Sequence, residues 1–301
     1  MEGARIIKRL DHVTVRVNNP EPLFSMLVDQ LLLPRAWPIT SYPLFTHAGV
    51  HLGNANLEIL QIGQRPHATR AARLYGLVFE MEPHELSLPE LDRRGIQHTP
   101  PTPFYVYDEQ GWQTTAWTSV ILGGLIRSST MERTFVNVSQ RLSTEGWERT
   151  AHPTQFNRRF RTPFLYDRIF RRWMVSGIQY NPAWYAANIQ EEPTRAGLEV
   201  TGLHEVAVGT SSFPTAYQSW KNLLADHEEV VKGIWRLESG VHVRLLQHNN
   251  DGLLGMTWQV ESLNRAAQFL HKRGMFGKER NKAISIAPRA IFGLHVRLVQ
   301  A

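Results

Sequence analysis

His12 and Glu58 are the two side chains of this sequence whose types and spacing best suit chemistry. His12 lies in the alternating, β-branched run LDHVTVRV, which predicts a strand over residues 9–17. Glu58 lies in a second such run, NLEIL. If the two strands are neighbours, an imidazole and a carboxylate can meet on one face of a sheet. Such a pair is a metal site, a metal-free acid and base, or a buried hydrogen bond with no catalytic role.

The alternation also assigns neighbours to this candidate site. Residues two apart along a strand share a face, and the residues between them face the opposite way, where they suit packing against a helix. Asn56 shares the face of Glu58. On the first strand, Leu10, Thr14 and Arg16 share the face of His12, and Asp11, Val13 and Val15 share the other face.

These strands belong to a repeated unit. The first copy has its strand at 9–17, a helix at 22–33 that Asn18 or Asn19 could cap, and strands at 46–53 and 55–63 joined at Gly53-Asn54. The order returns from about residue 202 and again from about residue 254. The segments GVHVRLLQ and GLHVRLVQ of these later copies are nearly identical, which indicates duplication.

A further copy is predicted between the first unit and the last two. It has a strand at 74–82, a helix at 84–95, a strand at 116–126 and a last strand at 162–170. The polar, basic stretch 127–162 interrupts it and has no counterpart in the other units, which is more typical of a lid or interface element than of a core element. Residues 173–199 are predicted to connect the two halves.

The repeat order, with the strands LDHVTVRV and NLEIL, resembles the vicinal oxygen chelate superfamily. This is the group of glyoxalase I, the bleomycin-resistance proteins and the extradiol dioxygenases. The resemblance implies an α+β fold of four βαβββ units, paired into two half-open barrels. One pair would occupy residues 1–185, including the insertion at about 127–162, and the other residues 186–301.

The resemblance also implies a function. It suggests a metal-dependent isomerase, lyase or oxygenase that acts on a substrate with vicinal oxygens in the cup of the first half. His12 and Glu58 would hold Fe, Mn, Zn or Ni, and His51, or His47 on the same strand, could be a further ligand. Tyr166, at the place in the second unit that matches Glu58, would be an acid or base.

The sequence departs from the family pattern in ways that leave alternatives open. The second-unit matches to His12 and Glu58, Leu77 and Tyr166, are not usual ligands for divalent metals. The two His and one Glu that extradiol dioxygenases carry in the second half are missing. A non-catalytic protein that sequesters a small molecule, or a metal-independent cyclase or hydrolase that uses His12 and Glu58, therefore remains an alternative.

Two more groups of residues are candidates for binding. The second cup would contain Glu205, His242, Arg244, His295 and Arg297. This set could hold an anion, or it could be a satisfied ion-pair network. Trp112 and Trp117 could shape an apolar pocket in the first cup, or they could be packing residues.

Composition limits the remaining classes of function. The 301 residues suffice for two domains, and the absence of cysteine excludes disulfides, thiolate metal sites and cysteine nucleophiles. No nucleic-acid motif accompanies the net charge of +6. We therefore expect a small-molecule substrate, aromatic or anionic, and no nucleic acid or membrane partner. With no signal-peptide run, a cytoplasmic protein is expected. Half-barrels of this fold close within one chain or between two, so a homodimer is also open.

Overall fold

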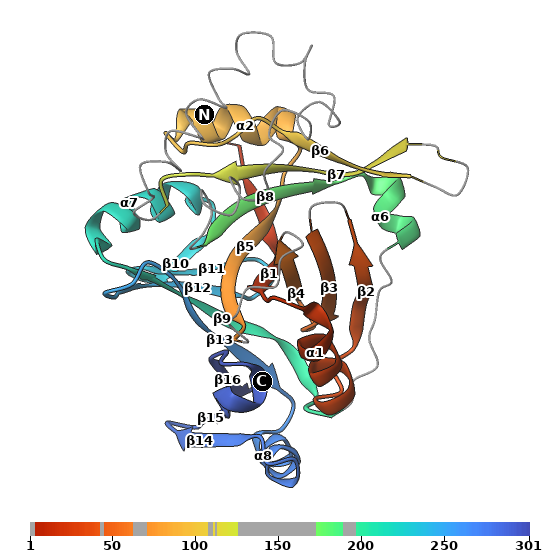
Figure 1. Cartoon of the computed structure of the whole chain (residues 1–301). Helices are drawn as coiled ribbons and strands as arrows, with labels where there is room; N and C mark the ends of the chain where they lie inside the picture. The colour runs from red at the N-terminus through yellow and green to blue at the C-terminus, as the bar shows by residue number, and fades with distance from the viewer. Residues whose placement is uncertain are drawn as a thin grey trace.

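Two eight-stranded sheets, one from each half of the sequence, form the protein (Figure 1). The computed structural model describes residues 4–42, 45–62, 71–107, 111, 113–125, 173–188 and 197–301. The first sheet has the strand order β2-β3-β4-β1-β5-β8-β7-β6, and the second has β10-β11-β12-β9-β13-β16-β15-β14. In each sheet two four-stranded units meet through their first strands, which run antiparallel.

Each unit consists of a strand, a helix and three strands, with its first and last strands parallel. The first unit contains β1 (Ile7–Arg16), α1 (Pro20–Ser25), a π-helical turn (Met26–Gln30), β2 (Arg35–Ser41), β3 (Phe45–His51) and β4 (Asn56–Ile62). The second contains β5 (Arg73–Met81), α2 (His84–Arg93), β6 (Thr102–Tyr107), β7 (Gln113–Leu122) and β8 (Met174–Tyr180), and α6 (Pro182–Asn188) follows it.

The second half repeats this order in shorter form. The third unit contains β9 (Val200–Thr210), α7 (Phe213–Leu223), β10 (Glu228–Val231), β11 (Ile234–Arg236) and β12 (His242–Gln247). The fourth contains β13 (Gly252–Val260), α8 (Leu263–Lys272), β14 (Phe276–Arg280), β15 (Ala283–Ile286), a 3-10 turn (Pro288–Ile291) and β16 (Val296–Gln300). The predicted four βαβββ units, paired into two half-open barrels, are confirmed.

Several strands differ from the prediction. Strands β2, β6, β10 and β14 were not expected; they lie at the sheet edges, where a strand needs no continuous apolar face. The last strand of the second unit is Met174–Tyr180, which pairs with β5 and β7. The prediction of that strand at 162–170 is therefore wrong, as is the prediction that all of 173–199 is a connection. Residues 162–170 themselves lie outside the described part of the chain.

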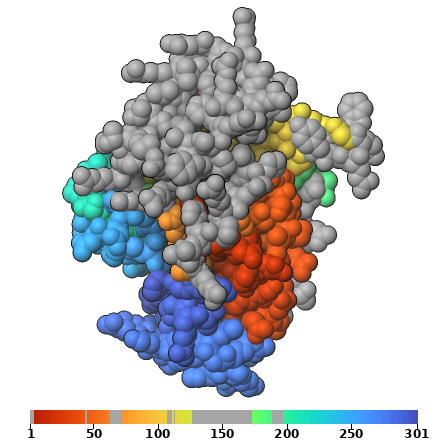
Figure 2. Space-filling model, viewed as in Figure 1, coloured from red at the N-terminus to blue at the C-terminus, as the bar shows by residue number. Residues whose placement is uncertain are grey.

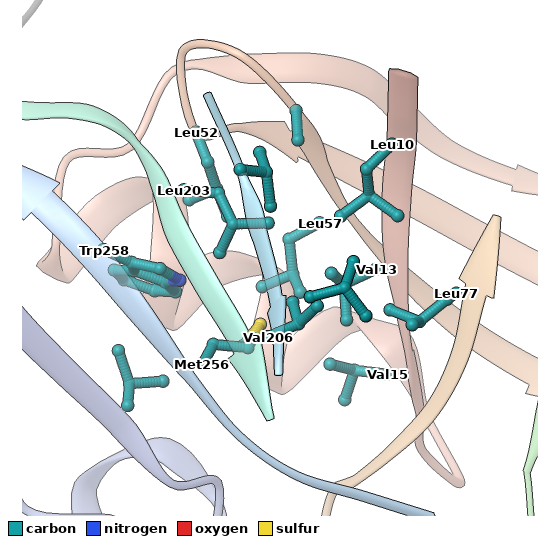
Figure 3. Close-up of a cluster of buried hydrophobic side chains, with 14 of the residues drawn as sticks. Leu10, Val13, Val15, Leu52, Leu57, Leu77, Leu203, Val206, Met256 and Trp258 are labelled. Atoms are coloured by element: carbon teal, nitrogen blue, oxygen red, sulfur yellow. The ribbon is translucent and has the colours of Figure 1, made fainter. Parts of the chain in front are cut away.

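The core lies where the two sheets pack back to back (Figure 3). Val13 and Val15 of β1 belong to one buried cluster with Val206 of β9 and with Met256 and Trp258 of β13. The outward face of β1 was expected to pack against a helix, but α1 instead contacts β3 and β4. Burying one sheet on the other leaves the concave face of each sheet available for a site.

The first sheet curls until its two ends meet. Rings near one end, Tyr42 and Phe45, lie 5.0 and 5.8 Å (between centroids) from Phe104 of β6, the strand at the other end. We call the concave side that carries Phe45, Phe104, His12 and Glu58 the first cup, and the matching side of the second sheet the second cup. In Figure 2 the fourth unit (blue) forms the lower end of the molecule, beside the red and orange first unit.

The turn between β3 and β4 docks the first sheet onto the second. The Asn54 side-chain amide donates to the carbonyls of Leu203 and Ser239 at 3.2 and 2.8 Å, and its oxygen accepts from the Leu203 N–H at 2.8 Å. Gly53 has a φ of +85°, and a Cβ there would lie 2.2 Å from the carbonyl oxygen of Thr201. The contact between the two halves therefore depends on the absence of a side chain at Gly53.

Gly53→Ala should destabilise the protein through this docking contact. A left-handed conformation costs an L residue about 1–2 kcal/mol. Gly95→Ala is a matched control, because Gly95 has a φ of +69° and a Cβ there would meet no heavy atom within 4 Å. In urea denaturation, the free energy of unfolding should fall by about 1–3 kcal/mol more in Gly53→Ala than in Gly95→Ala, because the clash adds to the conformational cost. Equal losses would contradict this reading of the turn.

Among the described residues, none of the helices combines the length and the apolar content that crossing a bilayer requires.

Candidate functional site

A β-bulge in β1 brings two polar side chains to the first cup. Between the pairs Leu10–Phe79 and His12–Val78, β1 advances two residues while β5 advances one, so Asp11 is the extra residue. Leu10 consequently lies in the apolar core, and Asp11 contacts the His12 ring. The predicted faces of Leu10 and Asp11 are wrong, because regular alternation does not continue across a bulge.

The imidazole of His12 lies between two carboxylates. Its Nδ1 is 2.7 Å from Oδ2 of Asp11, and its Nε2 is 3.3 Å from Oε2 of Glu58. Tyr180 of β8 donates its hydroxyl to the same Oδ2 of Asp11 at 2.9 Å. The side chains of His12 and Asp11 are only 9% and 2% exposed, so water screens these charges little.

Glu58 joins His12 to a second imidazole. Its Oε2 accepts a hydrogen bond from the Thr14 hydroxyl at 3.0 Å, as expected from the register that places Thr14 opposite Glu58. Its Oε1 lies 2.9 Å from Nδ1 of His47 on β3. The side chain of Glu58 is 14% exposed, which leaves it the most accessible member of the array. We call Asp11, His12, Glu58 and His47 the charged array.

The charges of the array determine its protonation. Burial alone would lower the pKa of His12, but the charge of Glu58 and the hydrogen bond to Asp11 outweigh it and raise this pKa well above 6.5. Burial alone would raise the pKa of Glu58, but His12 and His47 outweigh it and lower this pKa below 4.5. Burial and the charge of Asp11 raise the pKa of Tyr180, so its hydroxyl keeps the proton that it donates. At neutral pH an imidazolium therefore lies between two carboxylates.

Aromatic rings form a wall of the first cup beside this array. The centroid of Trp37 on β2 lies 6.2 Å from that of His12 and 5.8 Å from that of His47. The indole fits there because Gly49 has no side chain. A Cβ at that position would lie 2.3 Å from the nearest atom of the indole. The wall then continues from His47 through rings that each contact the next, namely Tyr42, Phe45, Phe104, Trp117, Trp184 and Tyr180.

At the level of His12 and Thr14, the second unit carries no imidazole or carboxylate in register. The β5 and β8 residues in register with His12 are Val78 and Ser176, and those in register with Thr14 are Gly76 and Met174. None of these four is an imidazole or a carboxylate. Farther along the cup an apolar patch surrounds the buried Tyr75 and consists of Leu60, Ile62, Ile121 and Met174.

These positions correct the matches expected in the second unit. Leu77, the expected match to His12, is buried in the core on the outward face of β5. Tyr166, the expected match to Glu58, lies outside the described residues, and β8 provides the strand expected there. The acid or base role of Tyr166 stays a prediction.

A divalent metal would need more ligands than the described residues supply. His12 Nε2 and Glu58 Oε2 are close enough to share an ion, and His47 is a third donor of suitable type. However, both oxygens of Glu58 already meet hydrogen-bond donors. In the described part of the chain, no group of three or more His, Asp or Glu side chains has the arrangement of a metal site. The described residues do not by themselves complete a metal site, and the ligand roles of His12, Glu58 and His51 stay predictions.

The remaining first-cup candidates lie in different places. His51 is opposite Asn56 on β4 and hydrogen-bonds to it, and burial lowers the pKa of His51. His47, not His51, therefore contacts Glu58. Arg16 is buried with its guanidinium 5.5 Å from the centre of the Tyr75 ring, at the apolar end of the cup. Trp117 belongs to the aromatic wall, whereas Trp112 and the insertion 127–162 lie outside the described residues.

The second cup has an ion pair at the place of His12 and Glu58. On β9 and β12, Glu205 is opposite His242 and Ala207 is opposite Arg244, the same register as His12–Asn56 and Thr14–Glu58. Glu205 and Arg244 form an ion pair at 2.7 Å. The His242 ring lies 5.0 Å from that of His204, and burial and this neighbour lower the pKa of His242. The second cup thus has a carboxylate at the place of the His12 imidazole and a guanidinium at the place of the Glu58 carboxylate.

The last two second-cup candidates belong to the fourth unit. Arg297 lies on β16 opposite Thr257 of β13, one strand farther from Glu205. His295 precedes β16 and is exposed, with its carbonyl bonded to the N–H of Met256.

Sequence reasoning missed three contributors to the site. Asp11 was assigned to the outward face, and Tyr180 was assigned to a connection. Trp37 falls between the predicted helix at 22–33 and the predicted strand at 46–53, in a segment that is in fact β2. An acidic residue directly before a strand histidine was a signal for Asp11, since a carboxylate commonly orients a functional imidazole.

Comparisons with known proteins agree on the fold. No protein-family model and no curated protein sequence matches the chain. Among solved structures, a variant of homoprotocatechuate 2,3-dioxygenase from Brevibacterium fuscum is similar with 9% identity and a TM-score of 0.57, over 98% of this chain and 72% of that one.

Two more structures give the same result. The complex of that dioxygenase with 3,4-dihydroxyphenylacetate has 8% identity and a TM-score of 0.55, over 98% of this chain and 81% of the other. A mutant of 4-hydroxymandelate synthase from Streptomyces coelicolor has 12% identity and a TM-score of 0.57, over 98% and 93%. At these identities the likeness establishes the fold only.

Proposed function

From the vicinal oxygen chelate fold of this chain, we propose that it is a small-molecule enzyme that moves a proton within an aromatic, oxygen-bearing substrate in the first cup. The observation that carries the proposal is the buried His12 ring held between the carboxylates of Asp11 and Glu58. Buried, charged groups with strongly shifted pKa values concentrate at catalytic sites. The reaction class is an isomerisation, which needs no atom from a co-reactant.

Each group of the charged array has a role in this reaction. Glu58 accepts a proton from a carbon beside a substrate carbonyl, and the bond electrons move to the carbonyl oxygen. The His12 imidazolium stabilises that oxyanion, while the Asp11 carboxylate holds the Nδ1 of His12. As His12 turns toward the oxyanion, Glu58 loses part of its partner's charge and becomes a better base. In an α-hydroxyketone the hydroxyl proton of the neighbouring carbon then passes to the oxyanion, and Glu58 returns its proton to the former carbonyl carbon, so the carbonyl and the hydroxyl exchange places and no atom is gained or lost.

The cup favours an aromatic substrate. The wall from Trp37 to Trp117 offers ring faces and edges beside the array, and the apolar patch around Tyr75 extends this surface. A neighbour in fold binds 3,4-dihydroxyphenylacetate, a ring with two adjacent oxygens. A compound of that kind is the first probe for this chain.

The family resemblance adds a rival in which Fe, Mn, Zn or Ni takes part. Since the described donors do not complete such a site, we route no step through a metal. Metal analysis of the purified protein, with activity before and after chelation, tests this rival directly. Activity that is lost on chelation and restored by one of these ions would replace the acid–base proposal with the metal-dependent one.

Glu58→Gln should abolish proton abstraction while the fold persists. General base catalysis contributes about 10²–10⁴-fold, so deuterium incorporation from D₂O into a panel of aryl α-hydroxyketones, followed by NMR, should fall by that factor. The matched control is Glu205→Gln, which makes the same change at the carboxylate of the second-cup ion pair. It should leave exchange unchanged.

Binding of 3,4-dihydroxyphenylacetate, followed by tryptophan fluorescence, separates the alternatives. Binding in wild type without any exchange would contradict the enzyme proposal and favour sequestration. Equal exchange in wild type and Glu58→Gln would exclude Glu58 as the base.

A further inference from the structure

A hollow in the second cup is lined by cations that the proposed reaction does not use. It has a volume of about 340 Å³ and lies on β14, β15 and β16, in the fourth unit. The pair of β14 and β15 is at the end of the molecule away from β6 and β7 of the first cup (Figure 1). The lining residues are Lys278, Arg280, Asn281, Ala283, Ile284, Ser285 and Arg297.

The register brings the three cations to β14 and β16, the two strands that flank β15. Arg280 on β14 pairs with Ala283 on β15, and Ser285 on β15 pairs with Arg297 on β16. Lys278 is tied to the same place, because its N–H donates to the Ser285 hydroxyl at 2.8 Å. Neighbouring strands are about 4.8 Å apart, so two positive charges on β14 and one on β16, on either side of β15, share one hollow.

No carboxylate of the described residues is placed to neutralise these cations. Lys278, Arg280 and Arg297 form no ion pair with any described residue, whereas the second-cup carboxylate Glu205 is taken by Arg244. Glu279, between two of the cations in sequence, is exposed and forms no ion pair with any described residue. Three close, unneutralised cations repel one another unless an anion joins them.

The chemistry of the lining points to one class of ligand. Ala283 is small and leaves room above the sheet, while Asn281 adds amide donors and acceptors at the rim. Guanidinium and ammonium groups that converge from several strands suit oxyanions with more than one negative charge. We propose that this hollow binds a small polyanion, a phosphate ester or a polycarboxylate, independently of the first cup.

Titration calorimetry with pyrophosphate and with citrate tests the site and distinguishes the two sources of charge. The wild type should bind at least one of them with one-to-one stoichiometry, and more weakly as salt rises. Arg297→Gln and Lys278→Gln should each weaken binding about tenfold or more, the effect of one charge-assisted hydrogen bond. Because Arg297 has no described partner to lose, Arg297→Gln should unfold no more easily than wild type in the absence of anion.

Lys272→Gln is the matched control, because it removes one charge from α8, outside the hollow. It should bind the anion like wild type, and so should Glu58→Gln if the two cups are independent. Absence of binding by both anions would overturn the proposal. Equal weakening in Lys272→Gln and Arg297→Gln would also overturn it, since that would reflect net charge alone.

Discussion

Asp11→Ala should lower the free energy of unfolding by about 3–5 kcal/mol relative to wild type, which is the typical cost of breaking a buried charged pair by removing one partner. The change leaves the Tyr180 hydroxyl and the Nδ1 of His12 without the carboxylate oxygen that they share. It also removes the charge that faces the Arg9 guanidinium at 3.8 Å. Urea denaturation near neutral pH measures the loss.

Glu228→Ala is the control for Asp11→Ala. Glu228 pairs with Arg236, but both side chains are more than half exposed, so its loss should cost at most about 1 kcal/mol. Asp11→Asn should lie between the two, because the amide keeps an acceptor but loses the charge. If Asp11→Ala costs no more than Glu228→Ala, the charged array does not exist as described.

Glu58→Gln should lower the pKa of His12 and make the stability of the protein less dependent on pH. Glu58 supplies the largest contribution that raises the pKa of His12, and the burial that opposes it remains in the variant. An NMR titration of the histidine ring, on protein freed of metal by chelation, should show His12 titrating above its ordinary value in wild type and at a clearly lower pH in Glu58→Gln.

The sign of the stability effect follows from linkage. The folded pKa of His12 is raised, so its contribution is complete below about pH 6.5 and is lost as pH rises through the folded value. The folded pKa of Glu58 is lowered, so its contribution is complete above about pH 4.5 and is lost as pH falls. The stability difference between wild type and Glu58→Gln should therefore be largest between about pH 4.5 and 6.5. A difference that is the same at pH 3, 5.5 and 9 would contradict the pairing.

The two cups show how one scaffold can hold different chemistry at the same place. His12 and Glu58 in the first half, and Glu205 and Arg244 in the second, occupy the same register positions on their sheets. The second pair joins a carboxylate to a guanidinium, which cannot give up its proton in proteins, so it stabilises without exchanging protons. The first pair joins a carboxylate to an imidazole, which can. That difference in side-chain type is why the proposed proton transfer belongs to the first cup.

The sequence alone was sufficient for the order of the repeated units, apart from the last strand of the second unit, and for the pairing of His12 with Glu58. Both depend on local periodicity. Regular alternation indicates which side chains share a face, and a repeat indicates which segments are equivalent. The match of Glu205 and Arg244 to this pair followed from the same alignment of repeats. Interior strands such as β1 and β9 were found because they carry continuous apolar faces, and the short edge strands were missed because they do not.

Only the tertiary structure decided what surrounds that pair. Asp11 turns toward His12 because β1 bulges against β5, and a bulge depends on the partner strand, which no local pattern contains. Tyr180 and Trp37 reach the array from strands far away in the chain, and the curl of the sheet joins Phe45 to Phe104. Contacts between distant segments set the protonation of the site and the shape of its wall, so these two properties could not be derived from the order of residues.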